Sequence, residues 1–326
     1  MRIFCSGNRL ERIAGLWHGL VVAAIAGAVG LTWIADAPKV RASGSTSPTA
    51  GLVTVAGFEW HTDYARAYQA ARSGKRMLLI NFVPGPSAHA TGTEADRAQA
   101  SLEKKIVACS ALRKQLAEVV LARLPRDAKI QLAGKTTRLL GNAAFQYLEG
   151  QPGIAIIDLV HQGAAYYGRV VNAFPFRSGK YYHWDPEYLS VALRLPPGTI
   201  TQRTMVWAVR IHPERPASTT GQEDPHLAQA AASHSQYQAD VGVQGHQQWE
   251  TRFHRIRSMV GAGTASEVVA ESWPGENMID SCIDCVDSWR HSSGHWRAVR
   301  SRHRLFGYDI RRGRNGIWYG TGIFAN

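Results

Sequence analysis

Apolar runs and helical stripes alternate along the chain from Phe58 to Pro196. The run Met77–Val83 is continuous and of strand length, which favours a central strand covered on both faces. Apolar residues recur at helical spacing across Trp60–Arg72 and again across Leu102–Leu116. Further strands are expected in three apolar segments, namely Val119–Leu124, Gln151–Asp158 and Tyr166–Val171. A last helix is predicted from Asp185 to Leu195, before Pro196-Pro197-Gly198. The pattern predicts an α/β domain over residues 58–197.

A different pattern follows this proline pair. Met205–Ile211 is rich in β-prone residues and predicts an entry strand. Apolar stripes predict helices over Leu227–Val241 and Met278–His291. Two closing strands are expected at Leu305–Ile310 and Gly316–Phe324, with Asn315-Gly316 as a strong hairpin signal between them. We therefore predict a second domain over residues 205–326.

The N-terminus carries the clearest targeting signal. Three arginines precede Ile13–Ala35, a segment without Asp, Glu, Lys or Arg that is long enough to span a bilayer as a helix. We expect residues 1–37 to be a signal peptide, cleaved after Ala37 or Ala42, or a signal-anchor helix. Residues 38–57, with Ser, Thr, Gly and Pro concentrated in 42–50, are expected to be a flexible linker. An uncleaved helix would leave the rest of the chain outside the cytoplasm by the positive-inside rule.

Composition adds little that is specific. The chain has 326 residues, of which 45% are hydrophobic and 19% charged, so each half can build its own core. The net charge of +12 favours anionic surroundings, and arginines are frequent from residue 297 onward. A solvated basic face explains the same excess, because basicity alone carries no sequence information. Nucleic acid is therefore not an expected partner.

Four cysteines do not form a disulfide framework. Cys282 and Cys285 form a lone CxxC inside a predicted helix, and no second pair offers the other half of a zinc site. Packing of two small apolar side chains on one helix face is the favoured interpretation. Redox chemistry through this pair or through Cys109, metal binding and a local disulfide stay open as alternatives.

The first domain resembles the thioredoxin-like family. The segments "DY..A...A...K..LLINF", from Asp63, and "PGIAIID", from Pro152, carry the resemblance. Pro152 lies where that family keeps a cis-proline. Family enzymes place CxxC after the first central strand, but Val83–His89 contains no sulfur. Disulfide exchange needs an attacking thiolate and a resolving thiol. The resemblance therefore implies a thioredoxin-like α/β domain that serves as a structural or binding module.

The second domain resembles the bacterial, SCP-like branch of the CAP superfamily of cysteine-rich secretory, antigen 5 and pathogenesis-related 1 proteins. The resemblance covers residues 205–326 and lies in the order of His246, Glu267, the segment Trp289–Trp296 and the closing Gly-rich run. It implies a CAP-like α-β-α sandwich with His246, Glu267 and His295 around one pocket. A literal Gly-Glu-Asn makes Glu276 a second candidate for the carboxylate, and Glu271 is a third. If the resemblance holds, the two histidines converge from different helices, Glu267 approaches them, Glu276 does not, and Trp289 is buried.

Two imidazoles and a carboxylate permit two kinds of chemistry. The trio His246, Glu267 and His295 could hold Zn²⁺ with an open fourth position, or act as an acid and base. The sequence lacks HExxH, and no Ser or Cys pairs with a His in a recognisable triad pattern. We expect an exported or membrane-anchored, non-catalytic module that binds a cell-envelope component, a lipid or an extracellular protein. The alternative is a zinc-dependent hydrolase that uses the same cleft.

Overall fold

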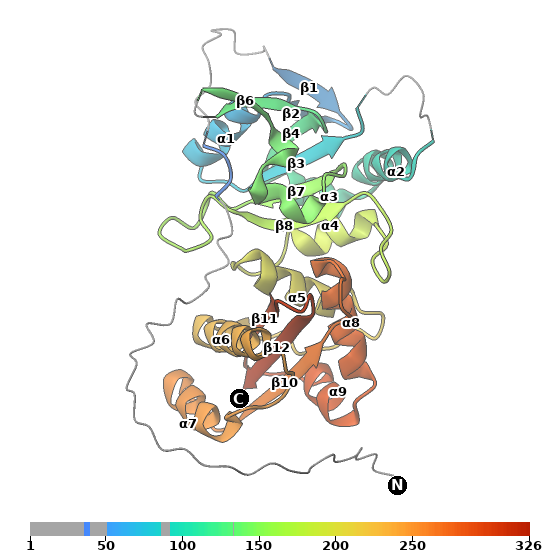
Figure 1. Cartoon of the computed structure of the whole chain (residues 1–326). Helices are drawn as coiled ribbons and strands as arrows, with labels where there is room; N and C mark the ends of the chain where they lie inside the picture. Colours follow the sequence, from blue (N-terminus) through green and yellow to red (C-terminus); the bar gives the residue numbers. More distant parts are fainter. Residues whose placement is uncertain (1–35, 40–50, 86–91, 133) are drawn as a thin grey trace, which may run out of the picture. The chain divides into compact units, whose positions relative to one another are not determined.

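The computed structural model describes residues 36–39, 51–85, 92–132 and 134–326 (Figure 1). The predicted targeting segment up to residue 35 and most of the predicted linker lie outside this range. Of the helices in the described part, none combines the length and hydrophobicity that crossing a membrane requires. The chain is a mixed α/β protein with a six-stranded sheet and a four-stranded sheet.

The six-stranded sheet belongs to the N-terminal half and has the strand order β1-β2-β4-β3-β7-β8. Strands β2, β4 and β3 are mutually parallel, whereas β1, β7 and β8 pair with their neighbours in antiparallel fashion. The strand bounds are Leu52–Val55 (β1), Phe58–His61 (β2), Leu78–Val83 (β3), Val120–Pro125 (β4), Gly153–Ile157 (β7) and Val170–Pro175 (β8). The predicted central strand is confirmed, because Leu78–Phe82 are all buried.

The helices of this half are α1, α2, α3 and α4, with a small hairpin and two 3₁₀ turns beside them. Their bounds are Tyr64–Ser73 (α1), Glu94–Ala108 (α2), Ser110–Ala117 (α3), Lys129–Leu132 (β5), Lys135–Arg138 (β6), Leu139–Gly141 (η1), Ala143–Leu148 (η2) and Pro186–Ala192 (α4). Side-chain caps fix the helix starts: Asp63 accepts the Arg66 N–H, and Thr93 forms a capping box with Asp96.

Several predicted boundaries are wrong for local reasons. The first helix starts at Tyr64, because Asp63 caps it and residues 58–61 pair with β1, which lies inside the predicted linker. The predicted helix over Leu102–Leu116 is two helices, since Cys109 adopts an extended conformation. Strand β8 starts at Val170, four residues later than predicted. The peptide bond before Pro152 is trans, like every other peptide bond among the described residues, and so differs from the cis-proline of the thioredoxin-like family.

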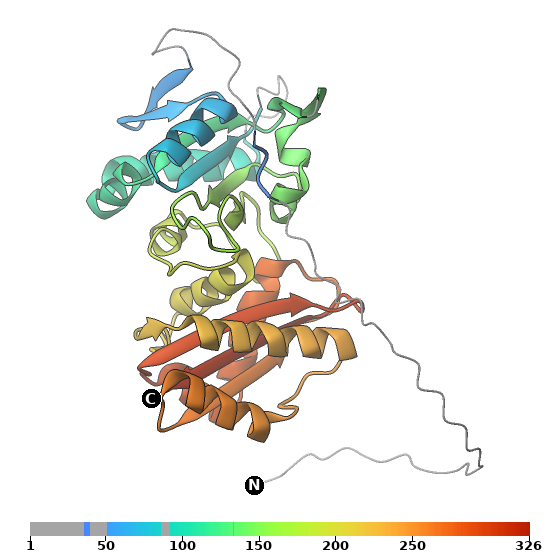
Figure 2. The same ribbon diagram turned by 90° about the vertical axis from the view of Figure 1, so that its left-hand side faces the viewer.

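The four-stranded sheet belongs to the C-terminal half, and its strand order is β10-β12-β11-β9. The two predicted closing strands are confirmed as an antiparallel pair. Helix α6 covers one face, while α8 and α9 cover the other (Figures 1 and 2). The bounds are Gln222–Glu223 (β9), Pro225–Val241 (α6), Trp249–Val260 (α7), Ala265–Glu271 (β10), Met278–Arg290 (α8), Ser293–Arg300 (α9), Leu305–Arg312 (β11) and Trp318–Ala325 (β12).

Glycines set the spacing of these layers. A Cβ on Gly307 of β11 would lie 2.2 Å from the backbone nitrogen of Ala228 on α6. A Cβ on Gly320 of β12 would meet the Cys285 sulfur of α8 at 3.2 Å. Gly307 lets α6 pack directly against the sheet backbone, and Gly320 lets α8 approach the opposite face closely.

The predicted entry strand is a helix. Helix α5 spans Ile200–Ile211, with Thr199 and Gln202 forming a capping box at its start. Its residues from Met205 to Val209 are all buried, so the apolar run does not alternate with polar positions. A short continuous apolar run fits a buried helix as well as a buried strand, so the sequence pattern alone could not distinguish the two at this position.

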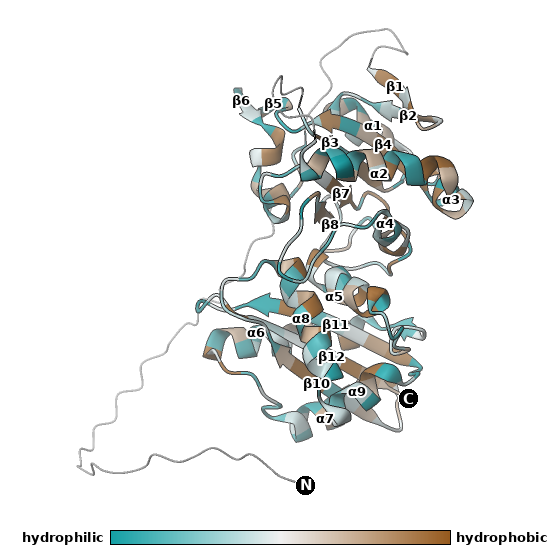
Figure 3. Cartoon of the chain, turned by 90° about the vertical axis from the view of Figure 1, so that its right-hand side faces the viewer, coloured by the Kyte–Doolittle hydropathy of each residue, from teal (hydrophilic) through white to brown (hydrophobic). Residues whose placement is uncertain are grey.

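The apolar core continues from one sheet to the other. Helix α5 contacts β8 of the first sheet as well as β11 and α8 of the second. At the start of α8, the buried carboxylate of Asp280 accepts backbone N–H groups of Lys180, Tyr181 and Tyr182 at 3.1, 2.7 and 2.6 Å. All described residues belong to one compact unit, and hydrophobic residues gather on the strands of its sheets (Figure 3).

Candidate functional site

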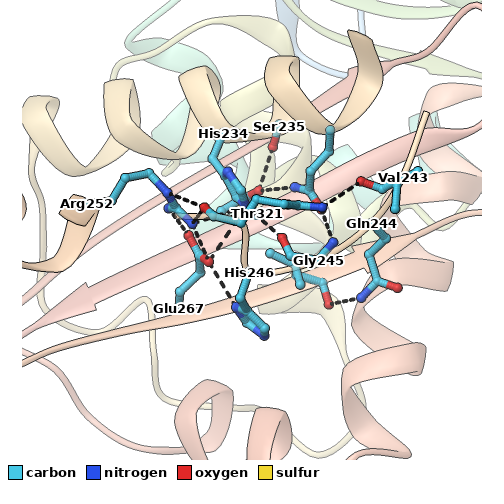
Figure 4. Close-up of polar contacts among 12 residues, drawn as sticks. His234, Ser235, Val243, Gln244, Gly245, His246, Arg252, Glu267 and Thr321 are labelled. Atoms are coloured by element: carbon cyan, nitrogen blue, oxygen red, sulfur yellow. Dashed lines mark hydrogen bonds and ion pairs between the residues drawn. The ribbon is translucent and has the colours of Figure 1, made fainter. Parts of the chain in front are cut away.

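The structure brings together the three residues that the sequence singled out. Nδ1 of His246 lies 2.9 Å from Oε1 of Glu267, and Nε2 of His246 lies 3.4 Å from Nε2 of His295. The residues come from three segments: the loop between α6 and α7, strand β10, and helix α9. His246 thus projects from a loop rather than from a helix, contrary to our expectation, and Figure 4 shows it beside Glu267.

Glu267 is the buried centre of the site. Its side chain is 1% exposed, and Arg252 of α7 donates to both carboxylate oxygens, one of them over 2.9 Å. Burial, the largest single influence, raises the pKa of Glu267, but hydrogen bonds from Arg252 and His246 outweigh it and lower that pKa below its ordinary value. Glu267 is therefore an ionised carboxylate at neutral pH.

Helix α6 positions the loop that carries His246 (Figure 4). The carbonyl oxygen of Gly245 accepts a hydrogen bond from Nε2 of His234 over 2.8 Å. The Gly245 N–H donates to Oε1 of Gln238 over 3.0 Å, and Gln238 in turn donates to Thr321 on β12. His234 and Gln238 are four residues apart and so share one face of the helix. The backbone next to His246 is therefore fixed on both its donor and its acceptor side.

The same contacts define the proton positions on His246. An ionised carboxylate can only accept, so Nδ1 of His246 carries the hydrogen that Glu267 receives. In a neutral ring, Nε2 then holds a lone pair directed at His295. Burial and then the neighbouring His246 lower the pKa of His295, which favours its neutral form. The His246 side chain is 43% exposed, so this edge of the pair is open to solvent.

The other sequence candidates lie elsewhere or serve the core. Glu276 forms an ion pair with Lys180 over 3.0 Å, and Glu271 is exposed at the end of β10. Glu276 is therefore not part of this site. Trp289 is fully buried on α8 and packs against the ring of Tyr308, with centroids 5.9 Å apart.

The geometry changes the predicted roles of the possible metal ligands. Within the described ranges, no group of three or more His, Cys, Asp or Glu residues is arranged to hold a metal ion. Glu267 is engaged by Arg252 and by Nδ1 of His246, which leaves the two Nε2 atoms as the available donors. Two nitrogens bound to one tetrahedral zinc ion would lie roughly 3.3 Å apart, given Zn–N bonds of about 2.0 Å. The pair fits the separation that a shared metal ion requires.

Sequence reasoning missed two residues of the site. They are Arg252 and His234, neither of which the sequence pattern singles out. His234 is buried, and its Nε2 lies 3.3 Å from Nη2 of Arg252. The sequence did contain one signal for His234. This residue lies four residues before Gln238 on a predicted helix, and a glycine-containing loop follows that helix, so both side chains could be expected to contact the loop.

The cysteines do not form a redox centre in the described part of the chain. Cys282 and Cys285 are free thiols, both fully buried, and burial raises the pKa of each well above the ordinary value. A buried thiol with a raised pKa supplies little thiolate for exchange. Cys109 is half-buried and has no disulfide partner among the residues that the structure describes.

Comparison with known proteins identified no relative. A scan against protein-family models, a search of curated proteins and a search of solved structures each gave no significant match.

Proposed function

We propose that this chain is an exported or membrane-anchored protein whose C-terminal part is a CAP-like binding module, joined to a thioredoxin-like domain without redox cysteines. Support for the CAP-like α-β-α sandwich comes from the helices on both faces of the four-stranded sheet and from the convergence of His246, Glu267 and His295. Support for the thioredoxin-like domain comes from the order of strands and helices around β3. Support for export comes from the N-terminal sequence.

Binding, rather than catalysis, accounts best for the contacts of the histidine pair, His246 and His295. Among the described residues, the imidazole of His246 bonds only to Glu267 and His295, and no hydroxyl or thiol is hydrogen-bonded to either imidazole. Nucleophilic catalysis of the serine or cysteine type requires such a contact between nucleophile and base. Nε2 of His246, which is oriented toward Nε2 of His295, is instead suited to accept a hydrogen-bond donor or a metal ion from a ligand.

The separation of 3.4 Å between the two Nε2 atoms carries the proposal. Zn²⁺ bound there would have two histidine ligands, with the remaining positions open to water or to a ligand from the cell envelope. Glu267 would act on the metal only through His246, as the carboxylate that orients its ring. The same separation favours one alternative function, a zinc-dependent hydrolase, because an open position on zinc can also activate water.

Zinc analysis and envelope binding together test the proposal. The purified protein should bind about one zinc ion per chain and should be retained by cell-envelope fractions. His246→Ala and His295→Ala should each abolish zinc binding, whereas His254→Ala, an exposed histidine on α7, should not.

The outcomes separate the two functions. The wild type is assayed for peptide or ester hydrolysis in parallel. Activity that is lost in His246→Ala and His295→Ala but kept in His254→Ala would establish the hydrolase and reject the non-catalytic proposal. Absence of both zinc and envelope binding would reject the proposed pocket altogether.

A further inference from the structure

A cavity that is not lined by His246 or His295 lies between the N-terminal helices and α5. It has a volume of about 450 Å³, which is within the range of small-molecule sites. Its walls come from the end of α2, the start of α3, helix α4, the end of α5 and the loop that follows α5. Residues from four helices and one loop therefore form the walls of the cavity.

The lining of this cavity is strongly cationic. Four basic side chains, Lys105, Arg194, Arg210 and Arg215, face a single carboxylate, Glu187, which pairs with Lys105. Among the described residues, none of the three arginines has a carboxylate partner. Arg210 donates to the carbonyl oxygens of Arg194 and Thr219 over 2.9 and 3.2 Å, and Arg194 donates to a backbone carbonyl. The lining therefore carries more positive than negative charge, with Glu187 paired to Lys105 and Glu223 acting on Arg210 through space.

Arg210 is the partly buried member of this basic set. Its guanidinium is half-buried, and burial lowers its pKa below the ordinary value, because a low-dielectric setting disfavours the charged form; Glu223 opposes this shift and the neighbouring Arg194 adds to it. A bound anion would offset the excess positive charge of the lining. Such charge-assisted bonds to arginine are among the stronger hydrogen bonds in proteins.

This character sets the cavity apart from four other cavities among the described residues. The cavity beside Pro152 is lined by two arginines and three carboxylates, and the cavity beside Glu223 contains that carboxylate as its only charge. The cavities beside Trp273 also carry more carboxylates than basic side chains. The general excess of arginine in this protein therefore does not by itself produce a cationic cavity, because these four cavities do not share it.

Apolar side chains complete the wall. Leu112, Val191 and Ile211 line the cavity together with the ring of Tyr188. Helix α3 begins at the same wall, after Cys109, without a side-chain cap. We propose that this cavity binds a small organic anion, whose phosphate or carboxylate head is held by Arg194, Arg210 and Arg215 and whose apolar body lies against Leu112 and Val191. The inference does not depend on the function proposed for the histidine pair.

Cys109 lines the cavity and serves as a reporter in the full-length protein. Its alkylation is followed by mass spectrometry of the Cys109 peptide, with iodoacetate as an anionic reagent and iodoacetamide as a neutral one. The cationic lining should raise the rate with iodoacetate relative to iodoacetamide. In Arg194→Gln/Arg215→Gln this ratio should fall roughly threefold at low salt, because two positive charges that line the same cavity as Cys109 are lost. Phenyl phosphate should protect Cys109 in the wild type and lose this effect in the double variant.

A charge-matched control separates the cavity from the net charge of the chain. Arg255→Gln/Arg314→Gln also removes two exposed arginines, and it should leave both the reagent ratio and the protection by phenyl phosphate unchanged. Phenol should not protect Cys109, because it lacks the anionic head. Protection that survives in Arg194→Gln/Arg215→Gln, or equal reagent ratios in the two double variants, would overturn the proposal.

Discussion

Arg252→Met is the most direct perturbation of the candidate site. The variant removes both hydrogen bonds from the guanidinium to Glu267 but keeps a side chain of similar length on α7. Glu267 would then be a carboxylate, 1% exposed, with His246 as its remaining side-chain donor. The variant also loses two hydrogen bonds from the guanidinium to the Gln247 carbonyl oxygen. The main cost should nevertheless arise from the uncompensated buried charge of Glu267.

The structure sets the size of the expected effect. Breaking a fully buried ion pair costs about 3 to 5 kcal/mol. The Arg252 side chain is 20% exposed, so solvent weakens its interaction, and we expect a loss near the lower limit, about 3 kcal/mol at pH 7. The loss should be smaller at pH 5. Without Arg252, burial raises the pKa of Glu267, and protonation then relieves the unpaired charge.

Urea unfolding at pH 7 and pH 5 measures both effects. Arg255→Met is the matched control, since Arg255 is exposed on the same helix and should cost less than about 0.5 kcal/mol. Adding Glu267→Gln to Arg252→Met should recover part of the loss, because the buried charge is then removed. Equal stabilities of Arg252→Met and Arg255→Met, or a loss that does not change with pH, would refute this account of the site.

Two further predictions concern packing and pH. Gly307→Ala should destabilise the protein by about 1 to 3 kcal/mol in urea unfolding, because the added methyl group meets the backbone of α6, whereas Gly294→Ala on α9, with open space around it, should not destabilise it. Unchanged stability of Gly307→Ala would contradict the close approach of helix and sheet. Burial lowers the pKa of His234 and of His295, so below pH 6.5 the unfolded chain takes up these protons first. The free energy of unfolding should therefore fall from pH 7 to pH 5. The variant His234→Gln should show a smaller fall over the same range. An equally large fall in His234→Gln would contradict the contribution of His234 to this pH dependence.

The elements with strong periodicity could be predicted from the sequence. Strand β3 is a continuous apolar run, and β11 and β12 flank an Asn-Gly turn, so length and turn chemistry define them. Helix α5 could not be identified in this way. Its burial comes from contacts with both sheets, and a run that is buried all round has no period that distinguishes helix from strand.

The candidate site was predictable to the extent that its residues occur in a recognisable order. That order indicates His246, Glu267 and His295, and the short distance along the chain from Glu276 to the helix with Trp289 favours Glu267 over Glu276. Arg252 was not selected, because its role depends on the angle at which α7 crosses β10, which the sequence pattern does not encode. The division of roles between Glu267 and the histidines likewise follows only from the distances.

The arrangement of the histidine pair also limits the kind of ligand that it can accept. Burial and the neighbouring imidazole keep His295 in its neutral form, and Glu267 holds the hydrogen of His246 on Nδ1. The open nitrogen of His246 is then an electron-pair donor, with a second imidazole nitrogen 3.4 Å away. Such a pair suits a metal ion or a hydrogen-bond donor and offers little to an anion. The cationic cavity between α4 and α5 has the opposite preference, so the two sites should bind ligands of opposite character.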